Sequence, residues 1–198
     1  MPALAPPVRD ERSALVAYLH QQQDAFRAVA HGLTDEQAGL TPTPSTLSVG
    51  ALVKHATGVQ RHWLGYAAAA PDRTKDARSR AEREAAYRDE FTFGEHDRLV
   101  AVLAEFDVVS GQVLDAVRAL DLDTPVPVPS EPWFPRDVDA WSVRWVWYHL
   151  VEELARHAGH ADIIREAVDG ATMFALLAAR EGWPETPWLK PWRPPAPS

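Results

Sequence analysis

Apolar side chains recur every three or four positions along four long segments of the chain, the spacing of a helix that buries one face. This spacing predicts helices over about residues 8–30, 48–69, 95–120 and 142–168. The third segment illustrates the pattern with Leu99, Val102, Phe106, Val109 and Val113. No segment shows the sustained alternation of apolar and polar residues that is typical of strands. The pattern therefore predicts an all-α fold.

Residues that start and stop helices agree with these boundaries. Ser48 stands where an N-cap is expected for the second helix, and Gly170 stands where the fourth helix ends. Thr34 and Gln37 have the spacing of a capping box, which predicts a short turn of helix between the first two long ones. A further short helix is expected over residues 171–180.

Two connections between the predicted helices are long. Residues 71–94 carry many charges of both signs, including Lys75 and Asp76, and we interpret them as a solvated, partly helical excursion. Residues 121–140 are interrupted by prolines, among them Pro132, and predict an extended crossover rather than a helix. Long crossovers are compatible with a four-helix bundle, in which facing helices commonly build metal sites.

The last residues alternate tryptophan with proline, at Trp183, Trp188 and Trp192. Three indole rings are costly to leave in water, and the prolines reduce the entropy lost on ordering. We therefore expect this segment to dock on the bundle or on a partner subunit, with a frayed extension as the alternative. The predicted organisation is a bundle domain over residues 1–182 and a Pro/Trp-rich tail over residues 183–198.

The fourth predicted helix carries the candidate chemistry. Glu153 and His157 are four residues apart and so lie one above the other, with His149 one turn earlier and His160 one turn later. The same stripe carries core-type aliphatic residues. A carboxylate and an imidazole on a face meant for burial are costly unless something pairs with them, and a divalent metal would do so. On this helix alone, a surface Glu–His pair or a hydrogen-bonded core histidine is an equal alternative.

A third ligand comes from the second predicted helix, where His55 follows the inward spacing. Two histidines and one carboxylate from two helices leave coordination positions open, as catalytic sites do more often than structural ones. We therefore predict a metal centre of His55, Glu153 and His157. His149 and His160 are expected either to orient ligands and move protons or to be hydrogen-bonded histidines at the rim.

Composition narrows the classes of function. The chain of 198 residues has a formal net charge of −8 and no cysteine. The negative charge argues against a nucleic-acid partner. The missing cysteines exclude disulfides, thiolate zinc sites and a thiol nucleophile of the protein itself. The apolar stretches are too short for a membrane span, and the first residues lack the pattern of a signal peptide. We therefore expect a cytoplasmic protein.

Two stretches resemble a known family. Residues 141–170, WSVRWVWYHLVEELARHAGHADIIREAVDG, resemble the last bundle helix of the DinB/YfiT-like superfamily. LSVGALVKHA at residues 47–56, followed by QRHW at 60–63, resembles the second helix of an actinobacterial branch of it. The superfamily usually binds metal through three histidines. Glu153 stands where one of them is usual, a departure shared with mycothiol-dependent, maleylpyruvate isomerase-like members.

The resemblance covers nearly the whole chain to about residue 180, and it implies a bundle with a divalent metal on His55, Glu153 and His157. The metal would be zinc, with nickel or iron as alternatives, and homodimers are frequent. For enzymatic members it implies transfer of a low-molecular-weight thiol such as mycothiol, here to a small-molecule electrophile. Two alternatives stay open: a hydrolase with metal-activated water on the same ligands, and a non-catalytic, metal-binding stress-response bundle.

Overall fold

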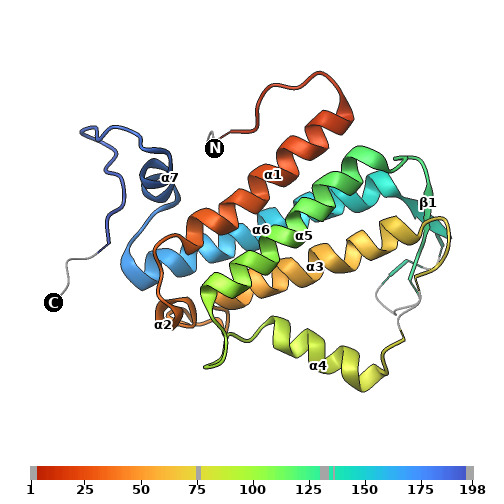
Figure 1. Ribbon diagram of the computed structural model, residues 1–198, viewed down its shortest axis with the longest axis horizontal. Helices are drawn as coiled ribbons and strands as arrows, with labels where there is room; N and C mark the ends of the chain where they lie inside the picture. The colour runs from red at the N-terminus through yellow and green to blue at the C-terminus, as the bar shows by residue number, and fades with distance from the viewer. Residues whose placement is uncertain (1–3, 75–76, 130–133, 136, 195–198) are drawn as a thin grey trace.

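The computed structural model describes residues 4–74, 77–129, 134–135 and 137–194. In this part of the chain, long helices lie side by side as a four-helix bundle (Figure 1). They are α1 (Glu11–Ala30), α3 (Val49–Ala69), α5 (Leu99–Ala119) and α6 (Val143–Asp169). Helix α3 packs against α5 and α6, and α1 packs against the same two helices. The predicted all-α bundle is confirmed. Among the described helices, none combines the length and the apolar character needed to cross a membrane.

Side-chain caps fix where these helices begin. The side chains of Ser48 and Ser142 each accept a hydrogen bond from the backbone N–H three residues later, and Gly170 ends α6 in the left-handed conformation. Helix α1 begins later than predicted because Asp10 is its N-cap and accepts the backbone N–H of Ser13. Helix α5 also begins later than predicted, because the Asp97 carboxylate closes a turn onto the backbone N–H of Gly94.

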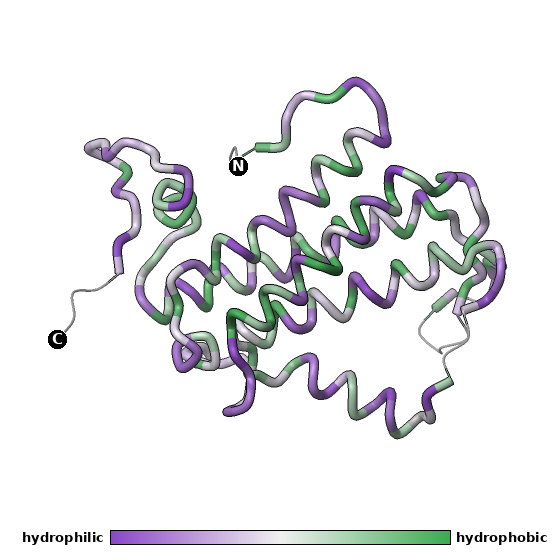
Figure 2. Tube along the Cα trace, in the orientation of Figure 1, coloured by the Kyte–Doolittle hydropathy of each residue, from purple (hydrophilic) through white to green (hydrophobic). Residues whose placement is uncertain are grey.

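Within the described residues, three shorter helices join the bundle: α2 (Asp35–Ala38), α4 (Arg80–Glu90) and α7 (Met173–Glu181). The capping box of Thr34 and Gln37 is present at α2, as predicted. Helix α4 lies in the segment expected to be a charged excursion. It runs alongside α3 (Figure 1) and is mostly hydrophilic (Figure 2), and most of its side chains are exposed.

The crossover before α6 is extended, as predicted, but it also forms a small sheet that the sequence pattern did not show. Strand β1 (Pro125–Pro127) pairs antiparallel with β2 (Ala140–Ser142). Strands of three residues are too short for alternation to be visible in a sequence. Some residues named in the sequence analysis lie outside the described part of the chain. They are Pro132 in the crossover, Lys75 and Asp76 in the charged excursion, and residues 195–198 in the tail.

The core runs between the four long helices and is mostly apolar, with a few buried polar side chains inside. Val113, a predicted core position, has no exposed surface, and neither do Phe106 and Leu150. Gln23 and Gln60 are also fully buried, and the amide nitrogen of Gln23 donates to the side-chain oxygen of Gln60 at 2.8 Å. This core holds α3 and α6 against each other, and it is these two helices that carry the predicted ligands.

The proline- and tryptophan-rich tail docks through Trp192. Its backbone N–H donates to the carbonyl oxygen of Ala175 at 2.9 Å, and its ring lies over Gly32, where a Cβ atom would be 2.3 Å from the indole. The expected burial is wrong for Trp188, which is 81% exposed. The domain boundary after residue 182 stays a prediction.

Candidate metal centre

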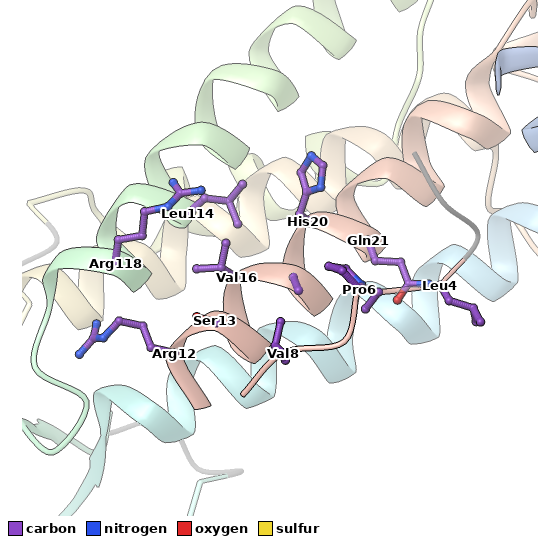
Figure 3. Close-up of a pocket in the computed structure, with 12 residues that line it drawn as sticks. Leu4, Pro6, Val8, Arg12, Ser13, Val16, His20, Gln21, Leu114 and Arg118 are labelled. Atoms are coloured by element: carbon purple, nitrogen blue, oxygen red, sulfur yellow. The ribbon is translucent and has the colours of Figure 1, made fainter. Parts of the chain in front are cut away.

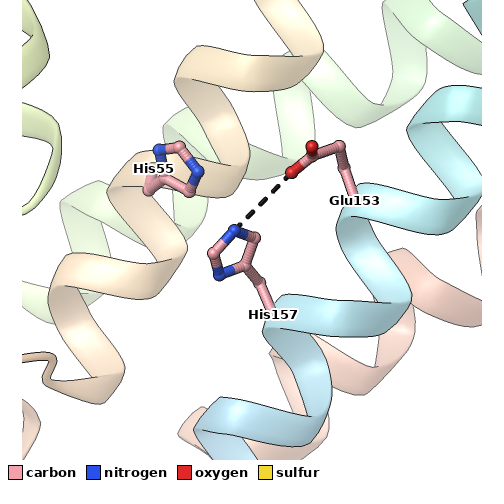
Figure 4. Close-up of side chains that lie close together, drawn as sticks. All are labelled: His55, Glu153 and His157. Carbon is pink, nitrogen blue, oxygen red and sulfur yellow. Dashed lines mark ion pairs between the residues drawn. The ribbon is translucent and has the colours of Figure 1, made fainter. Parts of the chain in front are cut away.

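The three predicted ligands come together between α3 and α6. One ligand atom each from His55, Glu153 and His157 can be chosen so that all lie within 4.8 Å of one another. Figure 4 shows one ring nitrogen of His55 turned across the gap towards Glu153 and His157. The His55 side chain is 8% exposed, that of His157 is 16% exposed and that of Glu153 is 29% exposed. The centre is therefore covered on the α3 side and partly open at Glu153.

The distances in this group suit a small divalent cation. The Oε2 atom of Glu153 lies 3.6 Å from Nε2 of His157, and the rings of His55 and His157 meet edge to face with centroids 4.7 Å apart. Zinc bonds of about 2.0–2.2 Å place two of its ligand atoms no more than about 4 Å apart. Side-chain shifts of less than about 1 Å would close the group around such an ion.

The electrostatic surroundings keep His157 in the form that binds metals. Burial lowers the pKa of His157 to about 4, and the electrostatic influence of the neighbouring His55, His160 and Arg156 side chains acts in the same direction. The imidazole is therefore neutral near pH 7, as a metal ligand must be. A carboxylate beside two imidazoles is a donor set that zinc commonly accepts.

The other two predicted histidines lie on either side of this group along α6. Nε2 of His149 is 3.8 Å from Oε1 of Glu153, and its ring stacks on Trp145 with centroids 4.9 Å apart. His160 is exposed, and its Nδ1 atom lies 3.4 Å from Nδ1 of His157. His149 is thus placed to orient Glu153, and His160 to contact His157; their chemical roles stay predictions.

Aromatic side chains gather on the His149 side of the centre. Trp63, which is 5% exposed, meets the ring of His149 edge to face at 4.7 Å and also contacts Trp141 and Trp145. Helical spacing alone allows either His62 or Trp63 to take the inward position on α3. The structure places Trp63 inward and His62 at the surface.

Glu90, the last residue of α4, and Phe91, which follows it, contact the group although neither was a predicted site residue. The Oε2 atom of Glu90 is 3.4 Å from Nδ1 of His55, and the ring of Phe91 stacks on His55 with centroids 4.1 Å apart. The interpretation of residues 71–94 as solvated is therefore wrong at the end of α4. The signal was present in Phe91 and Phe93, because large apolar residues after a charged run need an apolar surface to cover them.

A separate cavity of about 620 Å³ lies between the N-terminal segment, α1 and α5 (Figure 3). The two arginines that line it already have partners. Arg12 donates to the carbonyl oxygens of Val117 and Leu120 at the end of α5, and Arg118 pairs with Asp115 at 2.9 Å. The lining residues do not include the three predicted ligands. The cavity is therefore distinct from the metal centre.

Comparison with known families decides where the chain belongs. A family model described as mycothiol-S-transferase matches residues 14–170, a span that contains the whole His–Glu–His group. The chain belongs to this family. The resemblance to a mycothiol-dependent branch of the DinB/YfiT-like superfamily is thereby confirmed. Membership of the mycothiol-S-transferase family connects the chain with mycothiol-related, metal-dependent chemistry.

Among solved structures, the chain is similar to one titled as the crystal structure of the conserved protein of locus from Enterococcus faecalis. The two are 17% identical with a TM-score of 0.54, and the match covers 83% of this chain and 100% of the other. At that identity the likeness shows the fold alone. No curated protein sequence matches the chain significantly.

Proposed function

We propose that this protein is a metal-dependent transferase that joins a low-molecular-weight thiol of the mycothiol type to a small electrophile. The observation that carries the proposal is the convergence of His55, Glu153 and His157 in a member of the mycothiol-S-transferase family. Three protein ligands are the number that catalytic zinc sites commonly use, which leaves a position for an exogenous ligand. Zinc is the metal we propose, with nickel and iron as alternatives.

The roles of the residues follow from their surroundings. When bound, a divalent cation lowers the pKa of a coordinating thiol, so that the nucleophilic thiolate is available near neutral pH. His157 is kept neutral by its lowered pKa and offers a ring nitrogen without first losing a proton. Glu153 supplies the negative charge of the donor set, and its partial exposure leaves the centre open to a small molecule on that side. Since the chain has no cysteine, the sulfur comes from the cosubstrate.

A thiol-dependence assay tests this proposal. Zinc-loaded protein is mixed with monochlorobimane, with and without mycothiol, and the fluorescent thioether is followed. The sulfur would displace chloride from the electrophilic carbon, with release of the thiol proton. We expect acceleration only when both the thiol and zinc are present, and a loss of most of it in Glu153→Gln.

Two results would contradict the transferase. Hydrolytic turnover of ester or amide substrates without any thiol would favour the hydrolase on the same ligands. Zinc binding with no turnover of a panel of electrophiles would favour the non-catalytic, metal-binding bundle. The homodimer and the cytoplasmic location stay predictions alongside this function.

A further inference from the structure

The end of α4 lies against the His55 side of the metal centre. Beside the contacts of Glu90 and Phe91 with His55, an ion pair fixes this end of α4 to α3: Nζ of Lys54 lies 3.1 Å from a carboxylate oxygen of Asp89. The same Lys54 nitrogen is also 3.1 Å from a carboxylate oxygen of Asp97, just before α5. Glu90 is therefore held next to His55 by contacts on both neighbouring positions.

The two ring nitrogens of His55 face different partners. One is turned towards Glu153 and His157 (Figure 4), and Nδ1 is 3.4 Å from Glu90. Nδ1 is buried and makes no hydrogen bond of ordinary geometry with the residues that the structure describes. A buried ring nitrogen without a partner is rare in proteins. Histidines that bind metals commonly donate the N–H of their other nitrogen to a carboxylate, which fixes the tautomer and the ring orientation.

We propose that Glu90 is a positioning residue that accepts the Nδ1–H of His55 and thereby holds Nε2 towards Glu153 and His157. This inference rests on the metal centre of the proposed function. The distance of 3.4 Å is a few tenths of an ångström longer than an ordinary N–H···O bond, and a small rotation of the terminal carboxylate closes it. Glu90 lies outside the group of three converging ligand atoms, which separates its role from that of a ligand.

Gly58 provides the space that Glu90 occupies. A Cβ atom at position 58 would lie 2.3 Å from Cδ and from Oε1 of Glu90, so alanine there would push the carboxylate away. Gly65 lies in the same helix, and no described atom comes within 4 Å of a Cβ built there. The two glycines form a matched pair, because both replacements favour the helix but only one displaces Glu90.

Zinc affinity, measured by competition with a chelating dye, is the first test. Replacing the carboxylate in Glu90→Ala should lower the affinity by roughly 10- to 100-fold. Gly58→Ala should lower it in the same direction although Glu90 is still present. Gly65→Ala should match the parent protein, as should Glu95→Ala, which removes a carboxylate that is 87% exposed. Parent-like affinity in both Glu90→Ala and Gly58→Ala would overturn the proposal.

Nitrogen-15 NMR of the zinc-free protein at about pH 8, above the usual pKa of histidine, is the second test. We expect His55 to carry its proton on Nδ1 in the parent and in Gly65→Ala, and to shift towards the Nε2–H tautomer in Glu90→Ala and Gly58→Ala. An unchanged tautomer in these two variants would overturn the proposal. A parent protein that does not bind zinc would contradict the proposed function instead, while the NMR comparison would still decide the role of Glu90.

Discussion

Two polar clusters lie on α6, about two helical turns apart. Near the end of the helix, Arg165 has no exposed surface, yet each of its three guanidinium nitrogens donates a hydrogen bond. It donates to both carboxylate oxygens of Asp169 at 2.9 and 2.8 Å, and to the carbonyl oxygens of Val29 and His31 at 2.6 and 2.8 Å. The ring of Trp192 lies 5.0 Å from the same group. We call these residues the Arg165 cluster.

The candidate metal centre differs in how its polar atoms are paired. Its side chains approach one another at 3.4–3.8 Å, and Nδ1 of His55 is buried without an ordinary hydrogen bond to any described residue. Burial of a polar group is thus common to both clusters and does not separate structure from function. The extent of hydrogen bonding separates the two clusters. Polar groups that are hydrogen-bonded throughout indicate a structural role, whereas converging donor atoms without close partners indicate a site for a bound ligand.

Breaking the Arg165 cluster should produce the largest change in stability. Arg165→Met leaves Asp169 and two backbone carbonyls without their donor, so we expect the free energy of unfolding to fall by about 3–5 kcal/mol. Urea denaturation of the zinc-free protein measures this. Zinc affinity of the folded variant should stay close to that of the parent. A loss of less than about 1 kcal/mol would show that the cluster is not the structural element we describe.

Disrupting the candidate metal centre should change zinc affinity and leave stability almost unchanged. Glu153→Gln removes the charge of a proposed ligand, so zinc affinity should weaken by roughly 10- to 1000-fold. The stability of the zinc-free protein should change by less than about 1 kcal/mol, as is usual for partly exposed positions. Glu153→His is the matched variant and should keep zinc, since the superfamily commonly uses histidine there. If the glutamine variant resists a chelator as well as the parent does, Glu153 is not a ligand.

The contribution of the tail to the Arg165 cluster is the next smaller effect. Trp192→Ala should lower the free energy of unfolding by about 1–3 kcal/mol through lost apolar burial and the lost contact with Arg165. Trp188→Ala is the control, because that ring is 81% exposed, and should stay within about 0.5 kcal/mol of the parent. Equal effects of the two replacements in thermal denaturation would contradict a tail that docks through Trp192.

Asp162 lies between the two clusters and should give the smallest effect. Burial, with a smaller contribution from Glu166, raises the pKa of Asp162 to about 6. Between about pH 4 and pH 6 the folded state therefore holds a proton that the unfolded state releases, so stability falls as pH rises through this window. Asp162→Asn should remove that fall and be more stable than the parent at pH 7, by about 1 kcal/mol after screening by solvent. Parallel pH profiles of unfolding for the two proteins would contradict this assignment.

The sequence predicted the features that depend on neighbouring residues. The long helices follow from apolar spacing, and their ends follow from caps such as Ser48 and Gly170. The pair of Glu153 and His157 follows from the rise of a helix, and His55 from its inward position among apolar neighbours. Their convergence follows from the expectation that two amphipathic helices pack with their apolar faces towards each other.

The features that the sequence did not show depend on contacts between distant segments. In the sequence, Glu90 is one of many charged residues in a segment expected to be solvated. Its role depends on the packing of α4 against α3, where Gly58 leaves space for its side chain. Trp188 and Trp192 are both tryptophans that directly follow a proline. Of the two, only Trp192 contacts Gly32 and Arg165. Local spacing carries no information about which of two similar residues finds such a partner.

Anomalous X-ray diffraction from crystals soaked in zinc tests the central claim most directly, because it locates the ion without reference to activity. We predict an anomalous peak at the zinc edge between α3 and α6, about 2.0–2.2 Å from one nitrogen each of His55 and His157 and from an oxygen of Glu153. A peak elsewhere on α6, for example between His149 and Glu152 alone, or no peak at zinc concentrations that saturate other histidine sites, would contradict the account.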